Sequence, residues 1–78
     1  MVGVDPDLIR RVGSNIMAAR ERAGLTIVEV AAAVELSGAF LENVEHGDQT
    51  AYDGLDLLTF LKIVRCVGSA AGHILFNG

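Results

Sequence analysis

Apolar residues recur at intervals of three and four along almost the whole chain, and only short glycine-containing segments interrupt them. This spacing places them on one face of successive helices and leaves no segment with the alternation of a strand. The first predicted helix starts at Asp5-Pro6, where a capping carboxylate precedes a proline whose φ is already helical. It stops at Gly24, as helices commonly do. Its expected inward face consists of Leu8, Val12, Ile16, Ala19 and Ala23.

Two short helices are predicted next. Thr26 caps the second helix, and Glu29 three residues later completes a capping box. Ser37 caps the third helix, which stops at Gly47. The expected inward residues of these two helices are Val30, Ala31, Val34, Leu41 and Val44.

The second half of the chain predicts a loop and two more helices. Residues 48–54 contain several turn-forming residues and are expected to form the loop. Asp53 or Asp56 caps a fourth helix that ends at Gly68, and Ser69 starts a short last helix. The fourth helix is expected to bury Leu57, Phe60, Leu61, Val64 and Val67. The fold class is therefore all-α, with five helices in one domain over residues 1–78.

The length and composition of the chain indicate that part of its apolar surface is buried against another molecule. A chain of 78 residues buries only a modest fraction of its surface, yet 51% of its residues are hydrophobic. Cys66 is the only cysteine and is expected to be partly buried, so no disulfide compensates for the small core. An oligomer is the common remedy in such chains. No segment is long enough to span a membrane, and MVGVDPDL lacks the features of a signal peptide, so a cytoplasmic protein is expected.

Charge is distributed unevenly along the sequence. The net charge is −4, whereas nucleic-acid-binding domains are usually basic. Four arginines lie near the N-terminus, and no Lys or Arg occurs between Arg22 and Lys62. That interval contains seven carboxylates: Glu29, Glu35, Glu42, Glu45, Asp48, Asp53 and Asp56.

The sequence gives little support for an enzyme. Glu42 and Glu45 have only a loose version of the spacing of catalytic carboxylates, and a solvated helix face explains them better. His46, Cys66 and His73 lack the spacing of metal ligands. Neither a Ser-His-Asp order nor a phosphate-binding loop is present, so no cofactor, metal or small-molecule substrate is expected.

Residues 13–47, GSNIMAARERAGLTIVEVAAAVELSGAFLENVEHG, resemble the XRE, or Cro/cI-type repressor, domain family. Two short helices joined by a tight turn, at about residues 26–46, correspond to its helix-turn-helix unit. The segment LLTFLKIVRCVG resembles the family's fourth helix, and helices 4 and 5 would span about residues 55–76. The phrases that carry the resemblance are Arg20, Gly24-Leu25-Thr26, Ala31, Ser37 and Glu45-His46-Gly47.

The resemblance implies a lambda-repressor-like fold whose third helix, residues 37–46, faces the major groove of DNA. It implies an ion pair between Arg20 and Glu45 that stabilises the fold. It also implies a dimer contact in the helix 4–5 region, for which the candidates are Leu58, Ile63, Ile74 and Phe76. The expected DNA-binding or partner-binding face consists of Ile27, Val28, Ser37, Gly38, Ala39, Glu42, Asn43 and His46.

This face departs from the family in its chemistry. Ile27 and Val28 stand where the family usually has a phosphate-binding glutamine, and among the helix 3 residues only Ser37, Asn43 and His46 suit base contacts. Two hypotheses follow. The chain is a small transcription regulator that binds DNA, or it is a protein-interaction module that binds another regulator or a basic partner and does not bind DNA by itself. Either is expected to act as a homodimer or a heterodimer.

Overall fold

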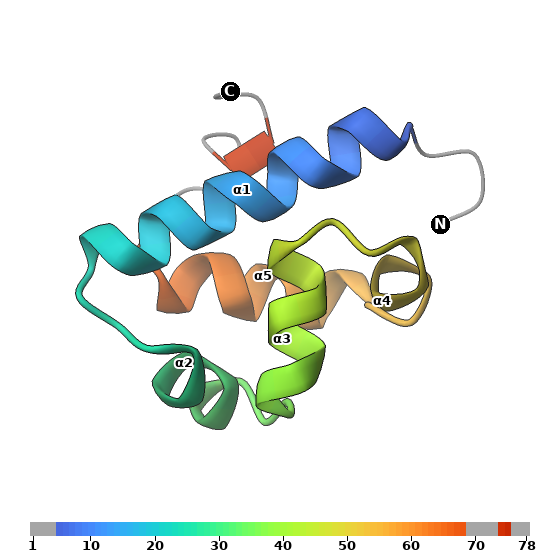
Figure 1. Ribbon diagram of the computed structural model, residues 1–78. Coiled ribbons are helices and arrows are strands. Elements are labelled where there is room, and N and C mark those ends of the chain that lie inside the picture. The colour runs from blue at the N-terminus through green and yellow to red at the C-terminus, as the bar shows by residue number, and fades with distance from the viewer. Residues whose placement is uncertain (1–4, 69–73, 76–78) are drawn as a thin grey trace.

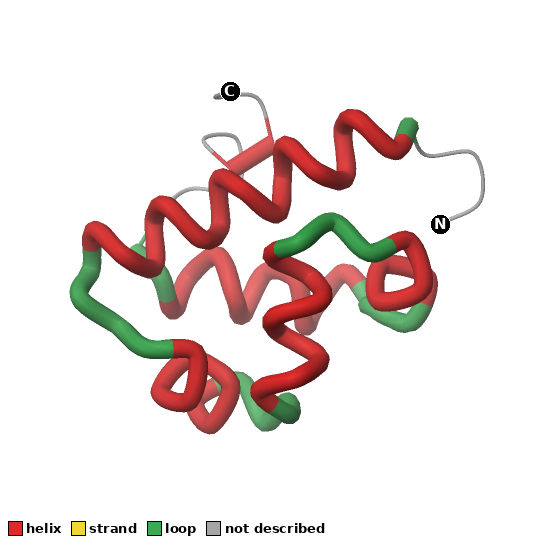
Figure 2. Tube along the Cα trace, in the orientation of Figure 1, coloured by secondary structure: helices red, strands yellow, loops and turns green. Residues whose placement is uncertain are grey.

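The computed structural model describes residues 5–68 and 74–75, which contain five α-helices and no strand. The predicted all-α class is confirmed for these residues. Figure 1 shows α1 across the top of the molecule, α3 crossing below it, and α5 behind α3. Short connections join successive helices (Figure 2). The helices are α1 (Pro6–Arg22), α2 (Ile27–Ala33), α3 (Gly38–Glu45), α4 (Gln49–Asp53) and α5 (Leu57–Cys66).

A polar side chain caps the start of every helix. The predicted caps of the first three helices are confirmed, and Asp56, one of two candidates, caps α5. The capping box of α2 is complete, because the Glu29 backbone N–H donates to Thr26 Oγ1 at 3.1 Å and Glu29 Oε1 accepts from the Thr26 backbone N–H at 2.9 Å. These side chains satisfy N–H groups that have no partner within the helix.

The prediction of a loop over residues 48–54 was wrong, because residues 49–53 form α4. Asp48 caps this helix, and Ala51 and Tyr52 are buried. The Tyr52 hydroxyl donates a hydrogen bond to the Val44 carbonyl oxygen at 2.9 Å. A five-residue helix is too short to show a periodic pattern and is held mainly by tertiary contacts of this kind.

The inward face of α1 differs from the predicted one at both ends. Ile9 is buried, whereas Leu8 is 39% exposed and Ala23 is exposed. The residues at 9, 12, 16 and 19 form a continuous stripe at helical spacing, and position 8 lies at its edge. Val12, Ile16 and Ala19 are buried as predicted.

The fourth predicted helix, α5, is rotated relative to the expected orientation. Val64 and Val67 are buried as predicted, and Phe60 is half-buried, but Leu57 is 73% exposed and Leu61 is 40% exposed. Most of the circumference of α5 is apolar, so its spacing alone does not specify which side faces the core.

Two predicted dimer contacts are wrong. Ile63 and Ile74 are completely buried within the chain, so neither is available to a second subunit. Asn15 Nδ2 donates to the Ile74 carbonyl oxygen at 2.6 Å, which fixes residue 74 beside α1. Leu58 is exposed, whereas Phe76 and most of the predicted last helix lie outside the described residues.

The buried position of Tyr52 predicts that the folded protein loses stability at alkaline pH. Burial, reinforced by the negative charge of Glu45, raises the pKa of Tyr52 well above its usual value. Tyrosine in the unfolded chain ionises near pH 10, whereas Tyr52 in the folded chain stays protonated to higher pH. The free energy that this difference contributes to stability is therefore fully present below about pH 10 and decreases as the pH rises further. Tyr52→Phe should abolish this part of the pH dependence and cost about 1 kcal/mol near neutral pH, because the Val44 carbonyl loses its donor.

Urea denaturation of both proteins across this pH range would measure the difference. The chain has one tyrosine, so ultraviolet titration of the folded protein reports Tyr52 alone. Ionisation of the folded protein near pH 10 would contradict the prediction.

Candidate functional site

The surface formed by α2 and α3 is the candidate site, and the turn between these helices determines its shape. Glu35 has a φ of 60°, the left-handed conformation that non-glycine residues adopt at a cost in energy. The Leu36 backbone N–H donates a hydrogen bond to the Ala31 carbonyl oxygen at 2.8 Å, just after the end of α2. The chain therefore turns sharply between α2 and α3, and both helices contribute buried residues to the same core.

Close backbone contact fixes α3 against α1. Gly13 of α1 lies so near the end of α3 that a Cβ atom there would be 2.5 Å from the Val44 carbonyl oxygen. Beyond α3, a Cβ atom on Gly47 would be 2.7 Å from Arg10 Cα. The inner side of α3 is thus in contact with α1, and its outer side faces away.

The predicted ion pair between Arg20 and Glu45 is present. Arg20 Nε donates to Glu45 Oε2 at 2.7 Å and Arg20 Nη2 donates to Glu45 Oε1 at 3.1 Å. The same guanidinium donates to the Leu25 carbonyl oxygen at 2.9 Å. The Glu45 side chain is only 3% exposed, and its hydrogen bond raises the pKa of Arg20. This pair ties the C-terminal ends of α1 and α3 together.

The predicted site residues form one surface on the outer sides of α2 and α3. Val28 is 74% exposed, and Ile27 and Gly38 are half-buried where the two helices meet. The distance from Ile27 Cγ2 to the position of a Cβ atom on Gly38 is 3.5 Å, so the two helices are in contact there. The exposed members of the surface on and beside α3 are Ser37, Ala39, Glu42, Asn43 and His46.

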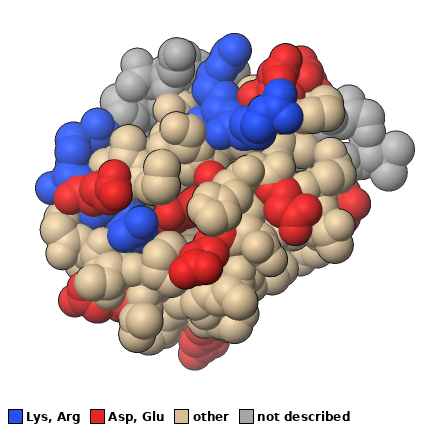
Figure 3. All heavy atoms as spheres, in the orientation of Figure 1, with Lys and Arg blue, Asp and Glu red and all other residues tan. Residues whose placement is uncertain are grey.

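Acidic side chains dominate the charge of this surface. Glu29, Glu35 and Glu42 are exposed on or beside α2 and α3. Figure 3 shows both Lys or Arg atoms and Asp or Glu atoms over α1, whereas the part of this view over α2 and α3 carries Asp and Glu among uncharged residues. Arg10, above the end of α3, forms an exposed ion pair with Asp7. The surface is therefore acidic, with small apolar residues between the carboxylates.

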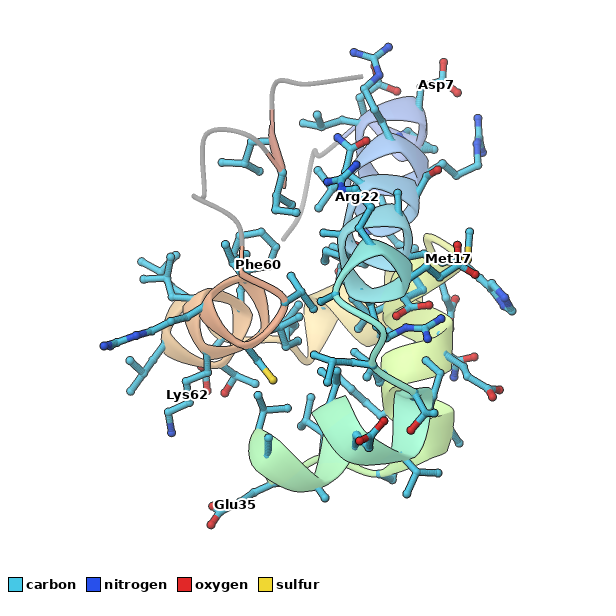
Figure 4. The ribbon with its side chains drawn as sticks, turned by 90° about the vertical axis from the view of Figure 1, so that its left-hand side faces the viewer. Asp7, Met17, Arg22, Glu35, Phe60 and Lys62 are labelled. Carbon is cyan, nitrogen blue, oxygen red and sulfur yellow. The ribbon has the colours of Figure 1, made fainter. Side chains whose placement is uncertain are left out.

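A second surface feature was not predicted from the sequence. An apolar groove of about 360 Å³ lies between the first half of α1 and the start of α5. Figure 4 shows Phe60 projecting from α5 toward the segment that contains residues 74–75. The many leucines of α5 could have indicated an exposed apolar surface, but Leu57 and Leu61 were assigned to the core. The groove is lined by Leu8, Ile9, Val12, Tyr52, Leu55, Asp56, Leu57, Phe60 and Leu75.

Within residues 5–68 and 74–75, no cluster of three or more His, Cys, Asp or Glu side chains is arranged to hold a metal ion. None of the helices in this part of the chain has the length and apolar character needed to cross a membrane. Comparisons with protein-family models, curated proteins and solved structures found no match to this chain. The two surfaces described above are therefore the features of this protein that bear on its function.

Proposed function

We propose that this protein is a small transcription regulator of the XRE-like helix-turn-helix type, in which α3 faces the major groove of DNA. The observation that carries the proposal is the placement of α3, whose inner side is fixed to α1 while Ala39, Glu42 and Asn43 on its outer side are exposed. A recognition helix needs such rigid presentation, because base contacts require defined geometry. The buried ion pair between Arg20 and Glu45 supports the same proposal, because it holds α3 against α1.

The side chains on this face allow a limited set of base contacts. Asn43 is suited to bidentate hydrogen bonds with adenine, and Ala39 is suited to contact with a thymine methyl group. Gly38 has no side chain and would let the start of α3 approach the DNA closely. Glu42 can accept from cytosine, but it would also repel nearby phosphates. Binding by this chain is therefore expected to be weak and to depend on arginines of α1 for phosphate contacts.

The alternative function is binding of a basic protein partner, and the charge of the surface favours it. Three exposed glutamates, Glu29, Glu35 and Glu42, lie on or beside α2 and α3, and α2 also carries the exposed apolar side chain of Val28. A partner that presents lysine or arginine beside a small apolar contact would be complementary to such a surface. The same face and the same α3 residues would serve this function, so the two hypotheses differ in the ligand.

Fluorescence anisotropy with a labelled random DNA duplex at low salt tests the DNA-binding function. We expect binding at micromolar protein that weakens as salt increases, with a slope of about 0.9 for each neutralised phosphate. Glu42→Arg should strengthen binding and steepen this slope. Asp53→Arg makes the same change of charge at an exposed residue of α4, outside α1 and the surface of α2 and α3, and is the matched control, with a smaller effect expected.

Absence of duplex binding at micromolar protein would refute the DNA-binding function. The protein-binding alternative then predicts that a labelled lysine-rich peptide binds the chain and that Glu42→Arg weakens this binding. Tight, strongly salt-dependent duplex binding would instead refute an exclusively protein-binding role.

A further inference from the structure

The apolar groove between α1 and α5 has a buried floor and an exposed rim. Its floor includes Ile9, Val12 and Tyr52, which are buried and belong to the hydrophobic core. Its rim includes Leu8 and Leu57, which are both exposed. The volume of about 360 Å³ lies within the range of small-molecule sites, which is about 300–1,000 Å³. The groove therefore has the size and the rigid base of a site for one small ligand.

The side chains that line the groove are unsuited to an anion. Among the described residues of the lining, Tyr52 has the only side-chain hydrogen-bond donor, and its hydroxyl donates to the Val44 carbonyl oxygen at 2.9 Å. Burial raises the pKa of Tyr52, so this hydroxyl stays neutral. A carboxylate or phosphate group in the groove would lose hydration without gaining a side-chain donor or a cation. The lining therefore favours a neutral or a cationic ligand.

Asp56 gives the edge of the groove a negative charge. Its Oδ1 atom accepts a hydrogen bond from the Thr59 backbone N–H at 2.7 Å at the start of α5. This bond is the main cause of the lowered pKa of Asp56, and the positive charge of Lys62, which is outside the lining, contributes less. The carboxylate is therefore ionised at neutral pH and retains acceptor capacity for an ammonium group.

We propose that the groove binds a small lipophilic amine, with its apolar body in the groove and its ammonium group beside Asp56. The aliphatic floor and the aromatic rings of Tyr52 and Phe60 remove the apolar body from water, which supplies most of the affinity. Phe60 projects from α5 on the side of residues 74–75 (Figure 4), and Leu75 also lines the groove. The carboxylate selects the charge of the ligand. This site is separate from the surface of α2 and α3 and does not depend on what that surface binds.

Titration of the intact chain with decylamine, decanol and decanoate tests the class of ligand, because the three molecules share an apolar body and differ in the headgroup. The chain has one tyrosine and no tryptophan, so its fluorescence reports Tyr52 in the groove. We expect saturable binding, with decylamine bound roughly threefold more tightly than decanol, as for one exposed charge pair, and decanoate bound most weakly. Equal affinities for the three molecules would overturn the cationic class. Absence of saturable binding by any of them would overturn the site.

Asp56→Asn tests the origin of the preference for an amine. Asparagine caps a helix about as well as aspartate, so α5 should keep its start, and circular dichroism verifies folding. This variant should bind decylamine and decanol with equal affinity. Glu42→Gln removes an exposed carboxylate of α3 and is the matched control, in which the preference should remain. A preference that survives Asp56→Asn would refute the role of this carboxylate.

Two adjacent leucines of α5 test the location of the ligand. Leu57 lines the groove, whereas Leu58 is exposed outside it. Leu57→Ala should weaken decylamine binding roughly fivefold, because the ligand loses apolar contact, and Leu58→Ala should change it by less than about twofold. Equal weakening by the two substitutions would place the ligand on the outer side of α5 and overturn the proposal.

Discussion

Replacing Arg20 with alanine is expected to lower the free energy of unfolding by about 3–5 kcal/mol. The substitution removes the partner of Glu45, whose side chain is only 3% exposed, and leaves a buried carboxylate without its cation. It also removes the donor to the Leu25 carbonyl oxygen. Small domains are stable by only about 5–15 kcal/mol, so this variant should be close to unfolding under mild conditions. Urea denaturation followed by circular dichroism measures the effect.

The ion pair between Arg10 and Asp7 provides the matched control. Both of its side chains are exposed, so Arg10→Ala should cost less than about 1 kcal/mol. A double variant, Arg20→Met with Glu45→Leu, should recover much of the stability lost in Arg20→Ala, because no charge remains buried. If Arg20→Ala costs no more than Arg10→Ala, the buried pair does not stabilise the contact between α1 and α3.

Replacing Gly13 with alanine is expected to destabilise the protein by about 3 kcal/mol, at the upper end of the usual cost of overpacking. The added methyl group would lie 2.5 Å from the Val44 carbonyl oxygen and 2.6 Å from the Glu45 carbonyl oxygen. Both are backbone atoms, so α1 and α3 must move apart to accommodate it. Intrinsic helix propensity predicts the opposite sign, because alanine is favoured over glycine by about 1 kcal/mol within a helix.

Thermal and urea denaturation of Gly13→Ala would measure this cost. The neighbouring residue Ser14 is exposed on the same helix, and Ser14→Ala is the control, with a change within about 0.5 kcal/mol expected. The displaced α3 should also weaken whatever binding the outer surface performs. A Gly13→Ala variant as stable as the wild type would show that α1 and α3 are less closely packed than described.

The local sequence was sufficient to predict much of the candidate surface of α2 and α3. Thr26, Glu29 and Ser37 act through hydrogen bonds to backbone groups three residues away, so their roles were evident without tertiary information. The resemblance to a known family indicated the contact between Arg20 and Glu45, which are 25 residues apart. Each residue expected on the outer face is exposed or half-buried in the structure.

The exposed side of α5 and the groove beside it could not be predicted without the tertiary structure. Helical spacing shows that α5 has an apolar face, but leucine, isoleucine and valine occupy most of its circumference. Only packing against the rest of the core decided that Ile63 is buried, that Leu57 lines the groove and that Leu61 is exposed. The prediction of a dimer contact through Ile63 failed for this reason, and that through Ile74 failed because residue 74 is buried beside α1.

The sequence by itself determined where most of the helices begin and end, because caps and glycines act on backbone groups of their own segment. Tertiary structure decided the existence of α4, which is too short to be stable alone and is held by the hydrogen bond from Tyr52 to the Val44 carbonyl. It also decided how closely Gly13 approaches α3 and which side of α5 faces outward. These properties depend on contacts between residues distant in the chain, which the spacing within a single helix does not specify.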